Sequence, residues 1–368
     1  MPVRIRSDLA SLNAYKPGKA APPGQGGPGG AFHKLSSNEN PFPPLPGVIE
    51  AATTAAQQMH RYPDASNLGV AEAVAADLSS SGVEVSSEHL SFSTGSVAVL
   101  FQILQTLCAA GDEVVYAWRS FEAYPLAVQL SGATSVQVPL REDGTHDLDA
   151  MRSAITDRTR VVMVCTPNNP TGPAVNHDEL ISFVDSVPDD VLVLVDEAYV
   201  EFITDPAAAR GVEVWQGRDN VVVLRTFSKA YGLAGFRVGY AVAPSDLAAA
   251  FRSVAVPFGV SVPAQAAVLA SLAAKPTLLK RVHELIERRD SLRESLLSLG
   301  FEVPQTQANF VWLKGGDRTG EFTETFGDLG IIVRPFAEGG PWDGVRISVG
   351  EPEANELVLR AARTLSSS

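Results

Sequence analysis

Between residues 113 and 243 the chain alternates short apolar runs with stretches of helical periodicity. The apolar runs are rich in β-branched residues and lack a polar face, which is typical of strands that helices cover on both sides. Two helical stretches, 147–155 and 178–187, lie between consecutive runs. The pattern therefore predicts an α/β fold with a mostly parallel sheet. The predicted strands are 113–116, 134–139, 160–166, 191–196, 220–226 and 237–243.

Beyond residue 276 the order of elements changes. A long amphipathic helix is predicted at 277–299, and three short strands mixed with two helices follow it. A chain of 368 residues is long enough for two domains, each with its own core. We therefore predict a large α/β domain at 46–270, a smaller α+β domain at 271–368, and an N-terminal segment, 1–45, that joins the smaller domain. The late strands are 308–313, 331–334 and 345–349, and the late helices are 319–329 and 353–366.

Charge and composition exclude several kinds of partner. The chain has 42 acidic and 29 basic residues, a net charge of −13, and no cluster of Lys and Arg, so nucleic acid and anionic membranes are poor partners. Its apolar runs are too short to span a bilayer, and no apolar stretch of a secretory signal follows Arg4 and Arg6, so we expect a cytoplasmic protein. Two isolated cysteines give no disulfide framework, and the six histidines show no metal-ligand spacing, so we predict no metal.

One segment has an unusual composition. Ten of the fourteen residues at 17–30 are Pro or Gly, and we expect a flexible surface loop there.

A lysine follows one of the predicted strands. The segment 226–239 (TFSKAYGLAGFRVG) comes directly after the strand at 220–226 and contains Lys229, Ser228 and Arg237. A lysine among small residues at a strand end can be held close to a ligand, and the serine and arginine can reach a phosphate from the same loop. Taken alone, a Ser-Lys pair is more often part of an exposed loop.

Two other strand ends carry polar side chains. Asp196 closes the apolar run 191–195, and Asn169 lies in the rigid loop 166–172 (TPNNPTG) after the preceding strand. In open α/β sheets, ligands bind at the carboxyl ends of the strands, where a desolvated aspartate needs a cationic partner. Alone, Asp196 is equally well explained as a helix cap.

The stretch 93–97 (STGSV) precedes a predicted helix at 98–110. Backbone N–H groups at a helix N-terminus, next to a glycine that lets an anion approach, form a phosphate cradle. The stretch matches neither G-x-G-x-x-G nor the P-loop, so a dinucleotide or Mg-nucleotide is not indicated. A plain serine cap is the alternative.

Together these motifs resemble the fold-type I pyridoxal-phosphate aminotransferases, the aspartate aminotransferase-like family, over essentially the whole chain. Within that family the chain is most similar to the histidinol-phosphate aminotransferase subfamily. The resemblance implies a large domain with a mostly parallel seven-stranded sheet, a smaller α+β domain, pyridoxal 5′-phosphate as cofactor, and a homodimer. The motifs are 35–41 (LSSNENP), 61–64 (RYPD), 196–199 (DEAY), 225–237 (RTFSKAYGLAGFR) and 345–349 (VRISV).

The resemblance also implies roles at the cofactor ring. Lys229 is similar to the Schiff-base lysine, which binds the cofactor aldehyde and later moves the substrate proton. Asp196 would pair with the ring nitrogen and keep it protonated, so that the ring acts as an electron sink. Tyr199 and Asn169 would hydrogen-bond the ring phenolate oxygen. Phe121 matches the aromatic residue that stacks on the ring, where the family often has Tyr.

The resemblance also implies which residues hold the cofactor phosphate. The phosphate would lie on the N–H groups of Ser96 and Val97, with Thr226, Ser228 and Arg237 around it.

Three further positions match the family. Tyr62 resembles the tyrosine that reaches the phosphate across a dimer interface. Arg346 resembles the arginine that grips the substrate α-carboxylate as a bidentate fork, with Asn38 supporting it. The alternatives are an ordinary turn tyrosine and a solvent-facing arginine.

The resemblance leaves the amino donor open. Fragments 118–125 (WRSFEAYP), 256–258 (VPF) and 307–313 (QANFVWL) resemble the actinobacterial aromatic amino-acid aminotransferases, which favours transfer from phenylalanine or tyrosine to 2-oxoglutarate. Histidinol-phosphate:2-oxoglutarate transfer is the alternative, and the segment 17–30 departs from both branches. Two alternatives belong to other functional classes. One is a pyridoxal-phosphate decarboxylase of the same fold, and the other is a non-enzymatic regulator with an aminotransferase-like module.

An aromatic donor needs an apolar slot, and glutamate needs a polar group for its distal carboxylate. We predict that Phe258 and Tyr124 line the slot, with Tyr15 and Phe42 entering from the N-terminal segment. Arg119 is the candidate for the distal carboxylate.

Overall fold

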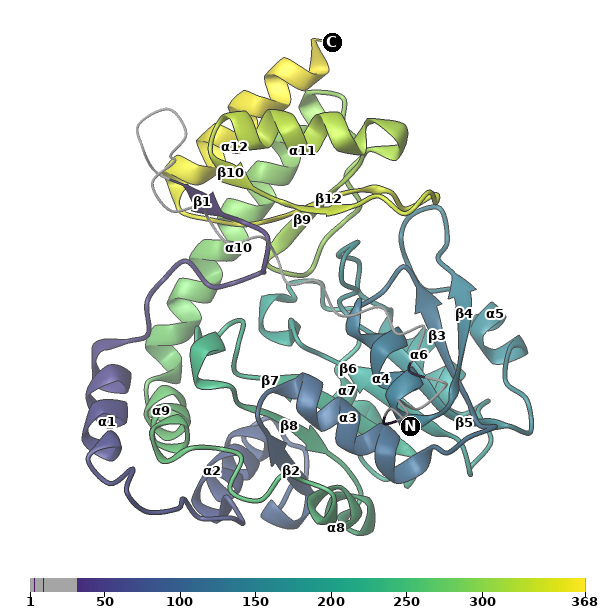
Figure 1. Ribbon diagram of the computed structural model, residues 1–368, viewed down its shortest axis with the longest axis vertical. Helices are drawn as coiled ribbons and strands as arrows, with labels where there is room; N and C mark the ends of the chain where they lie inside the picture. The colour runs from purple at the N-terminus through teal and green to yellow at the C-terminus, as the bar shows by residue number, and fades with distance from the viewer. Residues whose placement is uncertain (1–2, 4–8, 10–31, 368) are drawn as a thin grey trace.

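The structure, a computed structural model, describes residues 3, 9 and 32–367. The Pro/Gly-rich segment at 17–30 and Tyr15 lie outside the described residues. Figure 1 shows a large sheet with its helices in the lower part of the view and a small sheet with its helices above it.

Seven strands form the large sheet, in the order β2-β8-β7-β6-β5-β3-β4. β8 runs antiparallel to both of its neighbours, and the other neighbouring pairs are parallel. The predicted α/β fold with a mostly parallel sheet is therefore confirmed. The strands are β2 (Leu90–Ser93), β3 (Glu113–Trp118), β4 (Thr134–Pro139), β5 (Thr159–Cys165), β6 (Leu192–Asp196), β7 (Val221–Thr226) and β8 (Gly239–Val242).

Helices cover both faces of this sheet, which explains why its strands are apolar throughout. In β6, Val193 and Val195 pack into one buried cluster, and Leu192 and Leu194 pack into the other. On one face lie α1 (Pro46–Ala56), α2 (Leu68–Ser79), α5 (Leu148–Ser153), α6 (His177–Val184), α7 (Gly211–Trp215) and α9 (Val262–Ala273). On the other face lie α3 (Ser96–Leu107), α4 (Ala123–Ser131) and α8 (Ser245–Ser253).

The small sheet has three antiparallel strands in the order β11-β12-β9, and three helices pack on it. The predicted long helix is present as α10, which contributes Leu278 to the core of the large sheet and Leu296 to that of the small one. Figure 1 shows α10 running from one sheet to the other. These elements are β9 (Phe310–Lys314), β11 (Arg334–Phe336), β12 (Gly344–Ser348), α10 (Lys275–Ser298), α11 (Thr319–Asp328) and α12 (Pro352–Ser366).

A two-stranded sheet attaches the N-terminal segment to this second part. β1 (His33–Lys34) pairs in parallel with β10 (Ile331–Ile332). The single strand predicted at 331–334 is therefore wrong, because β10 pairs with β1 whereas β11 pairs with β12. Short 3-10 helices occur at Ser87–His89, Val200–Phe202, Ala234–Phe236 and Gly316–Arg318.

No single helix of the described chain is both long and apolar enough to cross a membrane, and α9 and α10 reach that length only together, across an 82° bend.

Candidate active site

A cavity of about 630 Å³ opens at the carboxyl ends of β5, β6 and β7. Parallel strands end at the same edge of a sheet, so polar residues that follow different strands meet there. All of the residues predicted to bind the cofactor or the α-carboxylate, except Tyr62, line this cavity. They are Asn38, Ser96, Val97, Phe121, Asn169, Asp196, Tyr199, Thr226, Ser228, Lys229, Arg237 and Arg346.

Lys229 is held above the aromatic ring of Tyr199. Its Nζ lies 6.0 Å from the centre of that ring and donates a hydrogen bond to the carbonyl oxygen of Ser37 at 3.1 Å. Burial lowers the pKa of Lys229 to about 8, and the positive charge of Arg346 adds to the effect. The amine is therefore a better nucleophile near neutral pH than an ordinary lysine.

Asp196 ends β6 and is buried. Its Oδ2 accepts a hydrogen bond from the hydroxyl of Tyr124 at 2.8 Å, whereas its Oδ1 has no hydrogen-bond partner among the described residues. Burial raises the pKa of Asp196 to about 6, and the Tyr124 hydrogen bond opposes the rise. A buried oxygen without a donor is rare in a folded protein, so Oδ1 is the natural acceptor for a ligand N–H.

Arg346 brings a guanidinium from β12 to the cavity. Its Nη1 donates to Oδ1 of Asn169 at 2.5 Å, and its Nη2 donates to the carbonyl oxygen of Ser36 at 2.6 Å. The rings of Phe310 and Phe336 lie 5.5 and 5.9 Å from it.

Asn38 lines the same cavity as Arg346 and hydrogen-bonds to Tyr199 and Ser348. Its Nδ2 donates to the hydroxyl of Tyr199 at 2.9 Å, and its backbone N–H donates to Oγ of Ser348 at 2.8 Å. Asn38 adopts a left-handed backbone conformation (φ 51°), which asparagine tolerates better than most residues. Burial raises the pKa of Tyr199, so its phenol stays protonated and able to donate.

The predicted phosphate cradle lies at the N-terminus of α3. Gly95 caps this helix at φ 95°, and a Cβ there would lie 2.6 Å from Nη2 of Arg237. Gly239 approaches the same turn so closely that a Cβ would lie 2.2 Å from the N atom of Ser96. The two glycines thus let an arginine and a neighbouring strand approach the first N–H groups of the helix, an arrangement that suits an anion.

Tyr62 lies apart from the cavity. Its side chain is 80% exposed and stacks on Phe258, with ring centres 4.5 Å apart. Phe258 is itself 42% exposed, and neither residue lines the cavity of its own chain. The expectation that Phe258 lines the substrate slot is therefore wrong for a single chain. An exposed aromatic stack of this kind is often covered by a partner.

Two other predicted slot residues are elsewhere. Tyr124 is fully buried and bonds Asp196, so it lines no slot. Phe42 lies in a separate shallow pocket beside the N-terminal segment, with Arg281 and Arg288 near its ring.

The arginine predicted to meet a distal carboxylate is also different. Arg119 forms an ion pair with Glu338 at 2.8 Å and lies over Trp118, and it does not line the cavity. Arg334, which the sequence reasoning missed, does line it and pairs with Glu122 at 2.8 Å. Arg334 faces Arg346 across the β11–β12 pairing, a register that becomes visible only when the two strands are paired.

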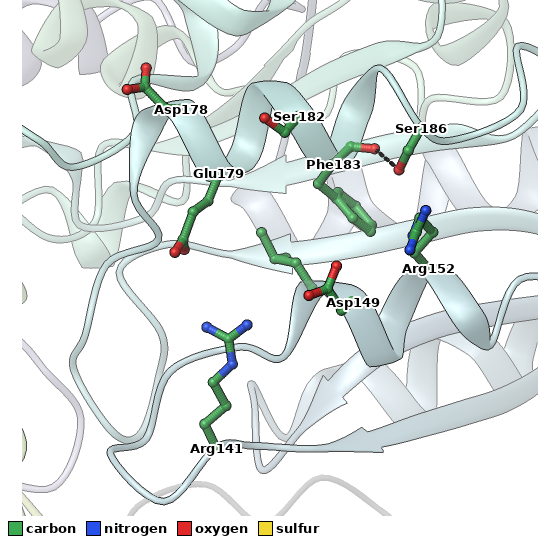
Figure 2. A pocket seen from close by; sticks show the side chains of 9 residues that line it. Arg141, Asp149, Arg152, Asp178, Glu179, Ser182, Phe183 and Ser186 are labelled. Carbon is green, nitrogen blue, oxygen red and sulfur yellow. Dashed lines mark hydrogen bonds between the residues drawn. The ribbon is translucent and has the colours of Figure 1, made fainter.

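A second cavity, of about 450 Å³, lies between α5 and α6, and Figure 2 shows its lining. Arg141 and Arg152 share it with Asp149, Asp178 and Glu179, a mixed set of charges, and none of the predicted site residues is there. No group of three His, Cys, Asp or Glu that could hold a metal ion occurs in the part of the chain that the structure describes.

Comparisons with known proteins agree with this geometry. Residues 32–361 match the family model described as aminotransferase class I and II. An aromatic amino acid aminotransferase of Streptomyces avermitilis is 53% identical over 97% of this chain and 96% of its own length, and one of Streptomyces coelicolor is 52% identical over 98% and 96%. The crystal structure of a Sinorhizobium meliloti histidinol-phosphate aminotransferase in complex with pyridoxal 5′-phosphate superposes with a TM-score of 0.87 at 25% identity, over 100% of this chain and 98% of that one.

Proposed function

The chain belongs to the class I and II aminotransferases and is a pyridoxal-phosphate-dependent transaminase, and from that premise we propose that it moves the amino group of phenylalanine or tyrosine to 2-oxoglutarate by a ping-pong mechanism. The observation that supports an aromatic amino donor is the lining of the cavity. Arg346 contributes a guanidinium to it, and Phe101, Phe121 and Leu126 contribute apolar side chains. The names of the two Streptomyces relatives support the same choice.

The residues present fit the cofactor. The buried Oδ1 of Asp196 has no donor in the described part of the chain, and a protonated ring nitrogen would supply one. Gly95 keeps the α3 N-terminus open beside Arg237, as an incoming phosphate requires. The amine of Lys229, with its lowered pKa, is suited to attack an aldehyde.

When bound, pyridoxal phosphate supplies a ring that accepts the electron pair of the bond broken at the substrate Cα. Lys229 would hold the cofactor and, once displaced, its Nζ would take the proton from Cα. Asp196 would accept the ring N–H at Oδ1, Tyr199 and Asn169 would bind the ring hydroxyl oxygen, and Phe121 would stack on the ring. The N–H groups of Ser96 and Val97 and the side chains of Thr226, Ser228 and Arg237 would hold the phosphate.

Arg346 would bind the α-carboxylate that an aromatic amino acid and glutamate share, through two parallel hydrogen bonds. We assign the distal carboxylate of glutamate to Arg334. Its pairing with Glu122 neutralises the guanidinium while an aromatic ring fills the cavity, and a dicarboxylate would compete with Glu122 for it.

We also propose a homodimer in which Tyr62 reaches the phosphate of the partner's site. The exposed stack of Tyr62 on Phe258 supports it, because a large aromatic side chain that is 80% exposed is expected at an interface.

Histidinol phosphate remains the second candidate donor. The observation that favours it is the pair Arg334 and Arg346, since two neighbouring guanidiniums suit a phosphate. The deciding experiment compares phenylalanine, tyrosine, tryptophan, histidine, branched-chain amino acids and histidinol phosphate, each with 2-oxoglutarate, by kcat/KM. We expect phenylalanine or tyrosine to lead. A kcat/KM for histidinol phosphate about tenfold or more above that for phenylalanine would replace the aromatic donor with the second candidate.

A further inference from the structure

Tyr124 belongs to the first turn of α4, and its side chain reaches the end of β6. Its side chain is fully buried, and edge-to-face contacts fix its ring, with ring centres 5.7 Å from Phe121 and 5.6 Å from Tyr116. The hydroxyl donates to Oδ2 of Asp196 at 2.8 Å. Because the ring is confined on both sides, this hydroxyl is a fixed donor and not a mobile one.

The two oxygens of Asp196 are therefore not equivalent. Oδ2 has its donor in Tyr124, and Oδ1 has none among the described residues, although Asp196 lines the cavity. A buried carboxylate with one free oxygen can turn about its Cβ–Cγ bond unless something holds it. The hydrogen bond from Tyr124 sets which oxygen remains for a ligand and in which direction it is presented.

We propose that Tyr124 is a positioning residue of the transamination reaction, which holds Oδ2 of Asp196 so that Oδ1 receives the N–H of the cofactor ring. The inference rests on the proposed function only for the role of Asp196 at the ring nitrogen. Tyr124 itself touches neither substrate nor cofactor.

The hydroxyl also decides where the shared proton lies. The ring nitrogen and Oδ1 are two bases that compete for one proton. Burial raises the proton affinity of Asp196, and the Tyr124 hydrogen bond lowers it. The nearby Cys165 adds no charge, because burial raises the pKa of its thiol far above neutrality. Without the hydroxyl, the proton would move from the ring nitrogen toward the carboxylate, and the ring would lose the positive charge that withdraws electrons.

The test compares Tyr124→Phe with Tyr116→Phe in the holoenzyme. Tyr116 is a matched control, because it is equally buried, packs on the ring of Tyr124, and its hydroxyl accepts a hydrogen bond from Nε2 of Gln137. The first readout is the 15N resonance of pyridoxal phosphate labelled at its ring nitrogen, which reports protonation independently of turnover. The second is the division of any loss between kcat and KM.

We expect the 15N resonance of Tyr124→Phe to move toward that of an unprotonated ring, and kcat to fall about ten- to hundredfold with KM nearly unchanged. Tyr116→Phe should match the wild type in both. An unmoved 15N resonance in Tyr124→Phe would overturn the proposal whatever happens to kcat. Thermal unfolding of both variants identifies a folding defect, and Tyr124→Met, which also lacks a donor, replaces Tyr124→Phe if that variant does not fold.

A double-mutant cycle tests this inference separately from the proposed function on which it rests. In an Asp196→Asn background, Tyr124→Phe should cost no further activity, because no carboxylate remains to keep the ring nitrogen protonated. An equal loss in both backgrounds would overturn the positioning role and leave the proposed function standing. An unprotonated ring nitrogen in the wild-type enzyme would instead remove the role given to Asp196.

Discussion

The amino group of Lys229 donates a hydrogen bond to the backbone carbonyl of Ser37, 3.1 Å away. The residues on either side of Ser37 are equally engaged, since Ser36 accepts from Arg346 and Asn38 donates to Tyr199. Three consecutive residues of the N-terminal segment thus contact the proposed lysine, the arginine for the carboxylate and the tyrosine for the ring. A shift of this segment would disturb all three together.

Lys229→Ala should abolish covalent attachment of the cofactor. The measurement is the mass of the protein after reduction with borohydride, which traps a lysine-bound cofactor. Lys275→Ala is the control, because Lys275 pairs with Asp77 and does not line the cavity. A Lys229→Ala protein that still gained the mass of the cofactor would refute the assignment.

The rate at which cofactor-free protein captures pyridoxal phosphate should depend on the protonation of Lys229. The pKa of Lys229 is lowered to about 8 by burial and by Arg346, so the reactive neutral amine prevails above that pH. Below it the rate should fall about tenfold per pH unit. Arg346→Gln removes a positive neighbour, so its midpoint should lie at higher pH. A midpoint that stays in place would show that the charge of Arg346 does not reach the amine.

Asp196→Asn should retain the cofactor and lose about 10²- to 10³-fold in kcat, because the amide cannot stabilise a protonated ring nitrogen. The visible spectrum confirms that cofactor is bound, and steady-state kinetics give the loss. Unchanged turnover would be incompatible with the role proposed for Asp196.

Changes at Arg334 and Glu122 should move the KM for 2-oxoglutarate in opposite directions. Arg334→Met removes the proposed partner of the distal carboxylate and should raise this KM about ten- to hundredfold, with the KM for phenylalanine little changed. Glu122→Gln weakens the ion pair that competes for Arg334, so it should lower the KM for 2-oxoglutarate. If each variant changed the KM for 2-oxoglutarate and the KM for phenylalanine alike, Arg334 would have no role in distinguishing the two substrates.

Mixing two inactive proteins tests whether Tyr62 acts across an interface. Tyr62→Ala keeps its own lysine, and Lys229→Ala keeps the tyrosine that it lends to a partner. Their hybrid dimer would therefore contain one complete site, and activity should appear on mixing after subunit exchange. Sedimentation gives the oligomeric state, and a fully active monomer at assay concentration would contradict the dimer.

The large sheet could be predicted because its strands are buried on both faces and read as continuous apolar runs. Each of the six runs predicted between 113 and 243 overlaps a strand. The stretch at 331–334 could not be resolved, because its two halves pair with different partners, the distant β1 and the next strand, β12. Periodicity carries no information about such partners. The division at 46–270 and 271–368 and the cytoplasmic location remain predictions.

Much of the candidate site was predictable for a related reason, since residues that follow parallel strands converge at one sheet edge. Tyr124 was misassigned because a helical pattern does not tell which side chain lies over a strand end. Its partner Asp196 is 72 residues away, and Arg334 is 212 residues from Glu122. Both roles depend on how whole elements pack, which motifs alone do not specify.

The hydrogen bonds from Arg346 to Ser36 and from Asn38 to Ser348 each join residues 310 positions apart. On the ribosome, the segment at 36–38 therefore emerges long before its partners on β12. The strands of the large sheet are complete at Val242, so this sheet can fold while synthesis continues. A nascent chain that has not yet reached β12 therefore carries the lysine and the aspartate without the arginine, and it gains the proposed carboxylate-binding residue only after the large sheet is complete.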